Sequence, residues 1–485
     1  MYIGVDLGST NIKAAIYDSN MKLVDRQSKP VNYIRDGGFV EFDAEKYFSD
    51  LAALIGEMVE KNGVKEIREI AFTGQAESLV CVGKDGKALM NAISWMDDRS
   101  SEECELLAKK FSAAECERIT GQQAVLPTWP ATKILWLKKN RPEVYEGTET
   151  FMLLKDYIVF KLSGVKAADM SIATFTFYFD IYDKCYWKEM LEAIGLSESK
   201  LPPLVEPCTT VGGLTPELAK KMHLSTETKV NVGTLDHFAG MIGTGNVSLG
   251  GVTLSTGTVM ALTTMAKEPA PRDSGIAMHY GFLPDTHVML PVAESGGVSL
   301  EWFHRTCMGE IGYDKMNEVL ATRDLPNNLI FLPYLVGTNA PEFDSDATGV
   351  FFGLRQENDV YDMAGAVMEG VSFMLRKNCD DILKKGTKVN YIIATGGGSK
   401  SPIWCQMQAD ITRLPVVIPA EKEAACLGAA LVAAVADGKY ASYEEAAKGC
   451  VSMVKRYEPR DIPAYEVKYK KFCALYDAVI KVTRM

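Results

Sequence analysis

The chain has no long hydrophobic segment. Its longest uncharged apolar run, residues 424–436, is rich in alanine and glycine and is too short to span a bilayer. The N-terminus lacks the basic region and following apolar region of a secretory signal. Basic charge is also in deficit, since 52 Lys and Arg residues stand against 63 Asp and Glu residues and give a net charge of −11. This balance argues against nucleic acid and anionic membranes as partners, although local loops can still bind a phosphorylated ligand.

Paired cysteines and common nucleotide motifs are missing as well. The eleven cysteines are scattered, odd in number and without a C-x-x-C pair. We therefore expect reduced thiols and a cytoplasmic protein. No G-x-x-x-x-G-K-[ST] sequence occurs, which excludes a P-loop, and no G-x-G-x-x-G follows the first strand, which argues against a dinucleotide fold. The histidines show no metal-ligand spacing.

What the sequence does have is enough length for two cores. A chain of 485 residues predicts two domains of about 200 residues each. The Gly-rich segment 245–251 is the best candidate boundary, so we expect domains at 1–246 and 247–485.

The first domain begins with three short β-type runs joined by good turn sequences. Residues 2–7, 12–17 and 22–27 predict an antiparallel meander. A helix then follows, with Asp43 as its N-cap and Gly63 just past its C-terminus. Strands that form a meander and then alternate with helices are typical of an α/β domain.

Residues 95–230 differ in composition, because they contain aromatic-rich helices and mixed loops. We interpret them as an elaboration around a ligand site, since such sites are lined by aromatic side chains and a few polar groups. The alternative is that these are ordinary amphipathic helices that pack on the sheet.

Polar turns suggest a phosphate site. The glycine triplet at 396–398 lies between a predicted strand and a helix, and the LSTGTV turn around Thr256 lies between two strands. Both could present N–H groups to an anion, and both could also be plain turns. The GSTN turn after the first strand has the same form. Two such hairpins could hold a polyphosphate, with Asp6 at the end of the first strand contacting a Mg²⁺ ion.

In this combination the chain resembles the actin-like ATPase superfamily and, from end to end, the FGGY family of carbohydrate kinases. The most specific match is GVFFGLRQENDVYDMAGAVMEG at residues 349–370. Other segments match in the family's order: VDLGST, W-x-D-x-R-S at 95–100, K-I-L-W-L at 133–137, LKDY at 154–157, G-x-x-D-x-x-A-G at 233–240, FLPYL-x-G at 331–337, GGGSKS and LGAA. The resemblance implies two actin-like (ribonuclease H-like) α/β domains separated by a cleft. The N-terminal domain would bind the sugar and carry the catalytic base, and the C-terminal domain would bind the nucleotide.

The resemblance also implies the site residues. Asp236 matches the catalytic base and, with four other residues, the sugar pocket; these four are Gln75, Glu77, Trp95 and Asp97. Asp6 matches the Mg²⁺ contact. The ATP-binding positions are Ser9, Thr10, Thr256, Gly257, Gly396, Gly397, Gly398 and Ser401. Phosphoryl transfer requires a carboxylate that orients the attacking alcohol and accepts its proton, which suits Asp236. His237 is the alternative base, although a histidine at a packed helix start is more often structural.

The substrate is less well defined. Where xylulose kinases of the family usually show GQMHG, this chain has GQAES, and it keeps only the Glu of the Arg-Glu pair of glycerol kinases. Glu77 suits hydrogen bonds to vicinal hydroxyls and disfavours an acidic sugar. We therefore expect ATP-dependent phosphorylation of a neutral ketose or polyol, D-xylulose or a related pentulose first, with glycerol, erythritol or gluconate as alternatives. No nucleic acid or membrane partner is expected, and a homodimer is one option for assembly.

Two other classes stay open from the residues alone. One is an actin-like filament or chaperone-type ATPase, against which the long 95–230 segment and Asp236 argue. The other is a degenerate kinase that acts as a sensor, against which the intact Asp6, Thr10, Asp236 and Thr256 argue.

Overall fold

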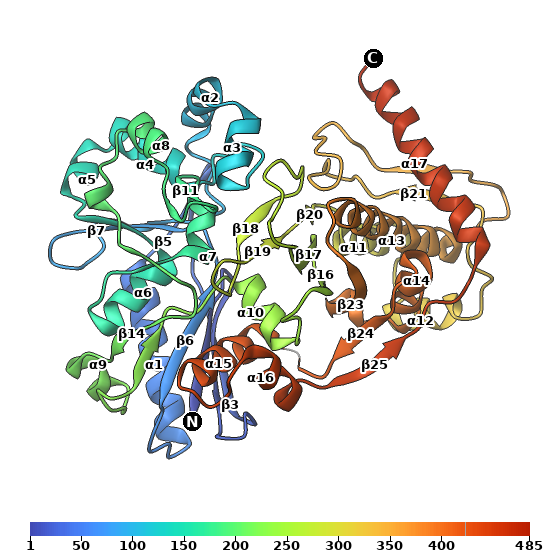
Figure 1. Cartoon of the computed structure of the whole chain (residues 1–485). Coiled ribbons are helices and arrows are strands. Elements are labelled where there is room, and N and C mark those ends of the chain that lie inside the picture. Colours follow the sequence, from blue (N-terminus) through green and yellow to red (C-terminus); the bar gives the residue numbers. More distant parts are fainter. Residues whose placement is uncertain (422) are drawn as a thin grey trace. The chain divides into compact units, whose positions relative to one another are not determined.

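The chain forms two compact α/β units, shown by a computed structural model that describes residues 1–421 and 423–485 (Figure 1). The first unit contains residues 1–247, 268–288 and 423–451. The second contains residues 248–267, 289–422 and 452–485. The first segment of the first unit ends within the predicted Gly-rich joint. A single boundary there does not describe residues 268–288 and 423–451, because these later segments also belong to the first unit.

The main sheet of the first unit has the strand order β14-β15-β6-β1-β2-β3. The strands β1, β2 and β3 form the predicted antiparallel meander. β6 and β15 continue the sheet beside β1 in parallel. The strand bounds are β1 (Tyr2–Leu7), β2 (Asn11–Tyr17), β3 (Leu23–Pro30), β6 (Glu69–Gly74), β14 (Thr210–Gly213) and β15 (Lys229–Asn231).

A second sheet and two small ribbons complete the strands of the first unit. The second sheet has the order β4-β5-β8-β7-β9, and the ribbons are β10-β13 and β11-β12. Their bounds are β4 (Ile34–Asp36), β5 (Phe39–Phe42), β7 (Leu79–Val82), β8 (Ala92–Ile93), β9 (Thr150–Leu153), β10 (Ala168–Asp169), β11 (Phe179–Asp180), β12 (Cys185–Tyr186) and β13 (Leu204–Val205). β18 (Met278–Tyr280) and β19 (His287–Met289) follow in the chain.

Most helices of the first unit come from residues 44–243. Their bounds are α1 (Ala44–Lys61), α2 (Ser101–Lys110), α3 (Ala113–Thr120), α4 (Pro130–Asn140), α5 (Pro142–Gly147), α6 (Leu154–Ser163), α7 (Met170–Ala173), α8 (Lys188–Ile194), α9 (Pro216–Lys221) and α10 (Asp236–Gly243), with short 3₁₀ turns at Thr174–Thr176 and Glu198–Lys200. The Asp43 side chain caps α1 by accepting a hydrogen bond from the Lys46 N–H, and Gly63 has a φ of +57° just past its end. Both predicted ends of this helix are therefore confirmed.

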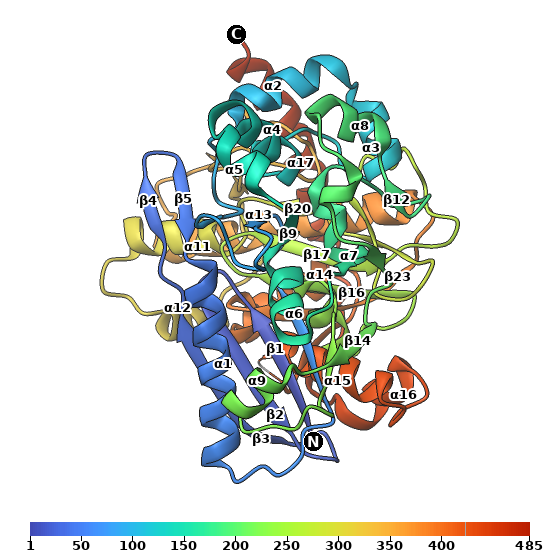
Figure 2. The same ribbon diagram turned by 90° about the vertical axis from the view of Figure 1, so that its left-hand side faces the viewer.

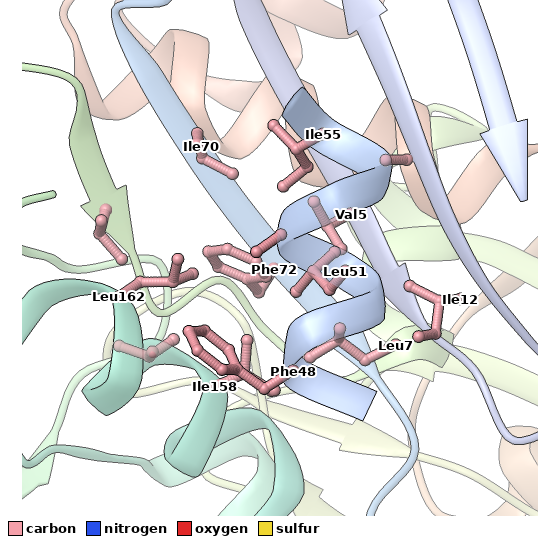
Figure 3. Close-up of a cluster of buried hydrophobic side chains, with 14 of the residues drawn as sticks. Val5, Leu7, Ile12, Phe48, Leu51, Ile55, Ile70, Phe72, Ile158 and Leu162 are labelled. Carbon is pink, nitrogen blue, oxygen red and sulfur yellow. The ribbon is translucent and has the colours of Figure 1, made fainter. Parts of the chain in front are cut away.

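The core of the first unit lies between α1, the main sheet and α6. Figure 2 shows α1 lying along the strands of the meander. In Figure 3, side chains of α1 such as Leu51 and Ile55 point toward Val5 and Phe72 of the sheet, and Ile158 of α6 closes the cluster. All five of these side chains are fully buried. This packing fixes the sheet whose strand ends carry the predicted site.

A helix from the far end of the sequence completes the first unit. α15 (Ala424–Ala436) packs against both β1 and α10 (Figure 1), and α16 (Tyr443–Cys450) follows it. A Cβ atom at Gly4 would lie 1.9 Å from the Cys426 carbonyl oxygen, and one at Gly428 would lie 1.8 Å from the Ala239 carbonyl oxygen. The small-residue composition of residues 424–436 is therefore explained by backbone-to-backbone packing.

The second unit is built on a sheet with the order β17-β16-β23-β24-β25, to which β20 adds beside β17. Its strands are β16 (Gly250–Thr256), β17 (Met260–Met265), β20 (Val292–Ala293), β21 (Ile330–Leu332), β22 (Val350–Phe352), β23 (Val389–Gly396), β24 (Val416–Pro419) and β25 (Met453–Tyr457). Its helices are α11 (Gly297–Phe303), which continues in a π turn, α12 (Tyr313–Leu320), α13 (Val360–Lys384), α14 (Pro402–Thr412) and α17 (Pro463–Thr483), and a 3₁₀ turn covers Gly398–Lys400. As in the first unit, an antiparallel hairpin adjoins parallel strands.

Two further expectations can be compared with the fold. All eleven cysteines are free, and all except Cys185 and Cys307 are at least partly buried. Within the described residues, no helix is both long enough and apolar enough to cross a membrane.

Candidate active site

Three predicted site residues lie at or after the carboxyl ends of neighbouring parallel strands in the first unit. Asp6 lies opposite Thr73 where β1 pairs with β6, and β15 pairs with the other side of β6. Gln75 comes directly after β6, and Asp236 follows the loop after β15. Because parallel strands end at the same edge of a sheet, these side chains share one edge, which is where α/β sheets bind ligands.

Asp6 is a mostly buried carboxylate. Its pKa is raised to about 7, mainly by burial and, second, by the negative charge of Asp236. Lys13, whose Nζ lies 3.9 Å from an Asp6 carboxylate oxygen, acts in the opposite direction. Asp6 and Asp236 are therefore close enough to repel each other, as two members of one site would be.

This pair of carboxylates fits the predicted Mg²⁺ contact. Mg²⁺ is usually held by one or two carboxylates together with substrate phosphates and water, and a divalent cation would offset the repulsion between Asp6 and Asp236. Across residues 1–421 and 423–485, no cluster of three or more His, Cys, Asp or Glu side chains could hold a metal ion.

Hydrogen bonds from two side chains hold the turn after β1 in place. The Gly8 carbonyl accepts hydrogen bonds from the Tyr47 hydroxyl at 3.1 Å and from the Gln75 amide at 3.4 Å. A Cβ atom at Gly8 would lie 2.6 Å from the Asn11 carbonyl oxygen, so the turn is too tight for a larger residue. Ser9 is partly buried and Thr10 is exposed, so a phosphate could reach this turn.

Two of the predicted sugar-pocket segments, those of Gln75 and Trp95, are joined by one hydrogen-bond chain. The Ser78 hydroxyl donates to the Gln75 side-chain oxygen at 2.8 Å and accepts from the Trp95 backbone N–H at 3.1 Å. Gln75 is nearly buried, whereas the Trp95 side chain is 39% exposed and presents its ring at the surface of the unit. The structure thus brings Gln75 and Trp95 together through a residue that the sequence did not single out.

Glu77 has an unusual backbone conformation that is held by a buried lysine. Its φ is +63°, in the left-handed region that is strained for a residue with a Cβ atom. The fully buried Lys133 ammonium donates to the Glu77 carbonyl at 3.1 Å and to the Ser94 carbonyl at 2.7 Å. Burial raises the pKa of the Glu77 carboxyl and lowers the pKa of Lys133, and each charge partly offsets the other's shift.

Asp97 is placed differently from the other predicted sugar contacts. It is completely buried, accepts a 2.6 Å hydrogen bond from the Val40 N–H, and forms a bidentate ion pair with Arg99. Arg99 also lies over the Phe39 ring at 4.2 Å. Asp97 therefore supports the fold of the 95–100 motif, and its assignment as a direct sugar contact stays a prediction.

Asp236 is the first residue of α10 and is half-buried. One carboxylate oxygen accepts a 2.6 Å hydrogen bond from the His237 N–H, which orients the side chain at the helix N-terminus. Helix N-termini favour nearby negative charge, and the Asp236 side chain lies at one. His237, the alternative base, bonds to Asp236 through its main chain.

The predicted phosphate turns of the second unit lie side by side. Thr256 pairs with Gly396 where the parallel strands β16 and β23 end. A Cβ atom at Gly398 would lie 2.9 Å from the Thr256 side chain, and Gly396, with a φ of +78°, packs against the Thr256 backbone. Gly257 and Gly397 are exposed beside them. This structure juxtaposes the LSTGTV turn and the glycine triplet, as the prediction of one phosphate site requires.

Ser401 is the N-cap of α14. Its hydroxyl accepts from the Trp404 N–H and donates to the Asn317 side chain at 2.7 Å, and the residue is 8% exposed. These hydrogen bonds show that Ser401 caps the helix, and its contact with the nucleotide stays a prediction.

Comparison with known proteins identifies the family. The model described as the FGGY family of carbohydrate kinases, N-terminal domain, matches residues 1–243, and the corresponding C-terminal domain matches residues 252–436. The chain belongs to the FGGY family of carbohydrate kinases. It is therefore a sugar kinase, a phosphotransferase that uses ATP, with the two α/β domains of the actin-like ATPase fold.

Individual relatives of this FGGY kinase cover nearly its whole length. It is 31% identical to a xylulose kinase of Bacillus subtilis (strain 168), over 99% of this chain and 97% of that protein. It is 28% identical to a gluconokinase of the same organism, over 96% and 93% of the two chains. The crystal structure of a ligand-bound xylulose kinase from Lactobacillus acidophilus matches with a TM-score of 0.91 at 28% identity, over 99% and 98% of the two chains.

Sequence reasoning missed the residues that support the site from behind. Lys133 and Lys155 lie within quoted motifs of the FGGY kinase, K-I-L-W-L and LKDY, but received no role. Both are completely buried. Both roles could have been predicted from a lysine among apolar helix residues. Such a lysine is expected to be buried, and a buried charge must be paired or hydrogen-bonded.

Proposed function

We propose that this FGGY kinase transfers the γ-phosphoryl group of ATP to a hydroxyl of a neutral ketose or polyol, with D-xylulose as the first candidate. The observation that carries the proposal is the pair of carboxylates, Asp6 near the carboxyl end of β1 and Asp236 after the loop that follows β15. Their mutual repulsion is the electrostatic condition that a bound Mg²⁺ and a transferred proton would relieve.

The proposed chemical step uses residues of this chain in defined roles. The acceptor hydroxyl oxygen forms a bond to the γ-phosphorus while the bond from that phosphorus to the β–γ bridging oxygen breaks, releasing ADP. The acceptor proton moves to the Asp236 carboxylate, which the His237 N–H holds in place. The proposed phosphate contacts are Ser9 and Thr10 in the first unit and Thr256 and Gly257 in the second. Bound Mg²⁺ would neutralise phosphate charge, with Asp6 as its protein contact.

Glu77 supports a neutral acceptor. A carboxylate at this position accepts hydrogen bonds from sugar hydroxyls and repels a second carboxylate. Lys133 does not reverse this preference, because its ammonium already donates to two backbone carbonyls. The likeness to a xylulose kinase over almost the whole chain supports D-xylulose among neutral sugars. The likeness to a gluconokinase makes gluconate the second candidate.

The test is an ADP-release assay with D-xylulose, other pentuloses, a tetrulose, glycerol, erythritol and gluconate. We expect the highest kcat/KM with D-xylulose and a loss of at least about 10²-fold in kcat for Asp236→Asn. A preference for gluconate would refute the role of Glu77. Normal sugar phosphorylation by Asp236→Asn would refute the assignment of the base.

Three finer expectations belong to the same proposal. The kinase requires Mg²⁺, acts in the cytoplasm and assembles as a homodimer. Activity after chelation and Mg²⁺ replacement tests the first, cell fractionation tests the second, and light scattering coupled to size exclusion tests the third.

A further inference from the structure

A buried ion pair lies behind the loop that leads to Asp236. Lys155 of α6 and Asp169, the N-cap of α7, are both completely buried, and the Lys155 ammonium lies 3.0 Å from the Asp169 carboxylate. The loop runs over residues 232–235, between β15 and the first residue of α10. A buried ion pair is weak evidence for stability, because desolvation opposes the attraction, so its retention calls for another explanation.

The pair holds this loop at both ends. At the start, the Lys155 ammonium donates to the Val232 carbonyl at 2.6 Å. At the end, the Asp169 carboxylate accepts from the Ser171 hydroxyl at 2.8 Å. The Ser171 oxygen in turn accepts from the Leu235 N–H at 3.1 Å. Leu235 immediately precedes Asp236, so the chain of bonds reaches the backbone of the proposed base.

The middle of the loop is fixed to the sheet and to Ser171. The Thr73 hydroxyl donates to the Thr234 carbonyl at 2.8 Å, and the Thr234 hydroxyl donates to Ser171 at 2.9 Å. Gly233 has a φ of +67°, and a Cβ atom there would lie 1.6 Å from the Phe72 carbonyl oxygen. Every loop residue from Val232 to Leu235 therefore has a fixed position, although the loop lies in no regular element.

We propose that Lys155, Asp169 and Ser171 are positioning residues that set the place of the Asp236 carboxylate. This inference rests on the proposed function of Asp236 as the base. Leu235, the N-cap of α10, forms no side-chain capping bond, so the helix start depends on the loop for its placement. A displacement of a reacting group by about 1 Å can lower a rate by about 10²-fold. The ion pair thus fixes the loop that positions Asp236.

The test variant is Ser171→Ala, which removes the hydroxyl bonded to the Asp169 carboxylate, the Thr234 hydroxyl and the Leu235 N–H without changing charge. Its control is Ser372→Ala in the second unit, since Ser372 is also completely buried and its hydroxyl also donates one hydrogen bond, and it accepts one where Ser171 accepts two. We expect both variants to melt at similarly lowered temperatures. Only Ser171→Ala should lower the sugar-dependent kcat, by about 10- to 100-fold, with the KM for ATP unchanged.

A double-mutant cycle with Asp236→Asn separates positioning from general damage. If Ser171 acts through Asp236, Ser171→Ala should lower kcat much less in the Asp236→Asn background than in the wild type. An equal factor in both backgrounds, or no loss in the wild type, overturns the positioning role while the proposed function stands. Near-normal turnover by Asp236→Asn alone overturns both. If Ser171→Ala does not fold, Thr234→Val, which keeps the side-chain shape, carries the same cycle.

Discussion

The close packing of α10 on α15 gives a prediction that can be worked out from two glycines of one helix. Gly240 and Gly243 both lie on α10, one turn apart. A Cβ atom at Gly243 would lie 1.9 Å from the Ala424 carbonyl oxygen, whereas a Cβ atom at Gly240 would meet nothing within 4 Å. The same substitution, Gly to Ala, should therefore have opposite effects at the two positions.

The magnitudes follow from two terms. Replacing a helical glycine by alanine stabilises a helix by up to about 1 kcal/mol, and this term alone applies to Gly240→Ala. At Gly243 the backbones of α10 and α15 must separate by about 1 Å before the Cβ atom fits, and such overpacking typically lowers the free energy of unfolding by about 1–3 kcal/mol or more. Because the helix term applies at both positions, the two variants should differ by the overpacking term, about 1–3 kcal/mol.

Thermal unfolding with and without ATP measures the difference. At about 2 °C per kcal/mol for a large domain, Gly243→Ala should melt about 2–6 °C below Gly240→Ala. Because α10 begins with Asp236, Gly243→Ala should also lower the sugar-dependent kcat. A Gly243→Ala protein that melts at or above Gly240→Ala would refute the reasoning that the two helices need backbone contact.

Three further predictions concern the ligands. Asp6→Asn should weaken the dependence of activity on Mg²⁺ concentration, as a Mg²⁺ titration at saturating sugar would measure, and an unchanged titration would remove Asp6 from the metal. Glu77→Ala should raise the KM for the sugar about 10- to 150-fold through loss of a charge-assisted hydrogen bond, with little effect on the KM for ATP; equal changes in both would argue against a sugar contact. Gly398→Ala should raise the KM for ATP, because its Cβ atom would displace Thr256, whereas Gly312→Ala, whose Cβ atom meets nothing within 4 Å, should not.

Much of the local structure was predictable from neighbouring residues. The meander of β1–β3 and the ends of α1 follow from alternation, turn residues and capping at Asp43 and Gly63. These signals depend on residues only a few positions apart, so they can be recognised without the fold. The motifs that mark an FGGY kinase, including the segment around Asp236, are equally local and were sufficient for the family.

The tertiary structure alone decided what supports those motifs. In the fold the Lys155 ammonium donates to the Val232 carbonyl, 77 positions away, and the Lys133 ammonium donates to the Glu77 carbonyl, 56 positions away. In the structure α15 belongs to the first unit. The boundary predicted from the sequence near residue 246 would have placed this helix in the second domain. The fold also buries Asp97 and pairs its carboxylate with the Arg99 guanidinium.

The physical reason is the range of each interaction. Periodicity, capping and turn chemistry are properties of a short segment, and the sequence by itself determined them together with the residue types that phosphoryl transfer needs. Which buried lysine pairs with which carbonyl, and which helices approach close enough to require glycine, depends on how distant segments pack. Such contacts form only when the chain closes around its core, so only the folded structure decided them.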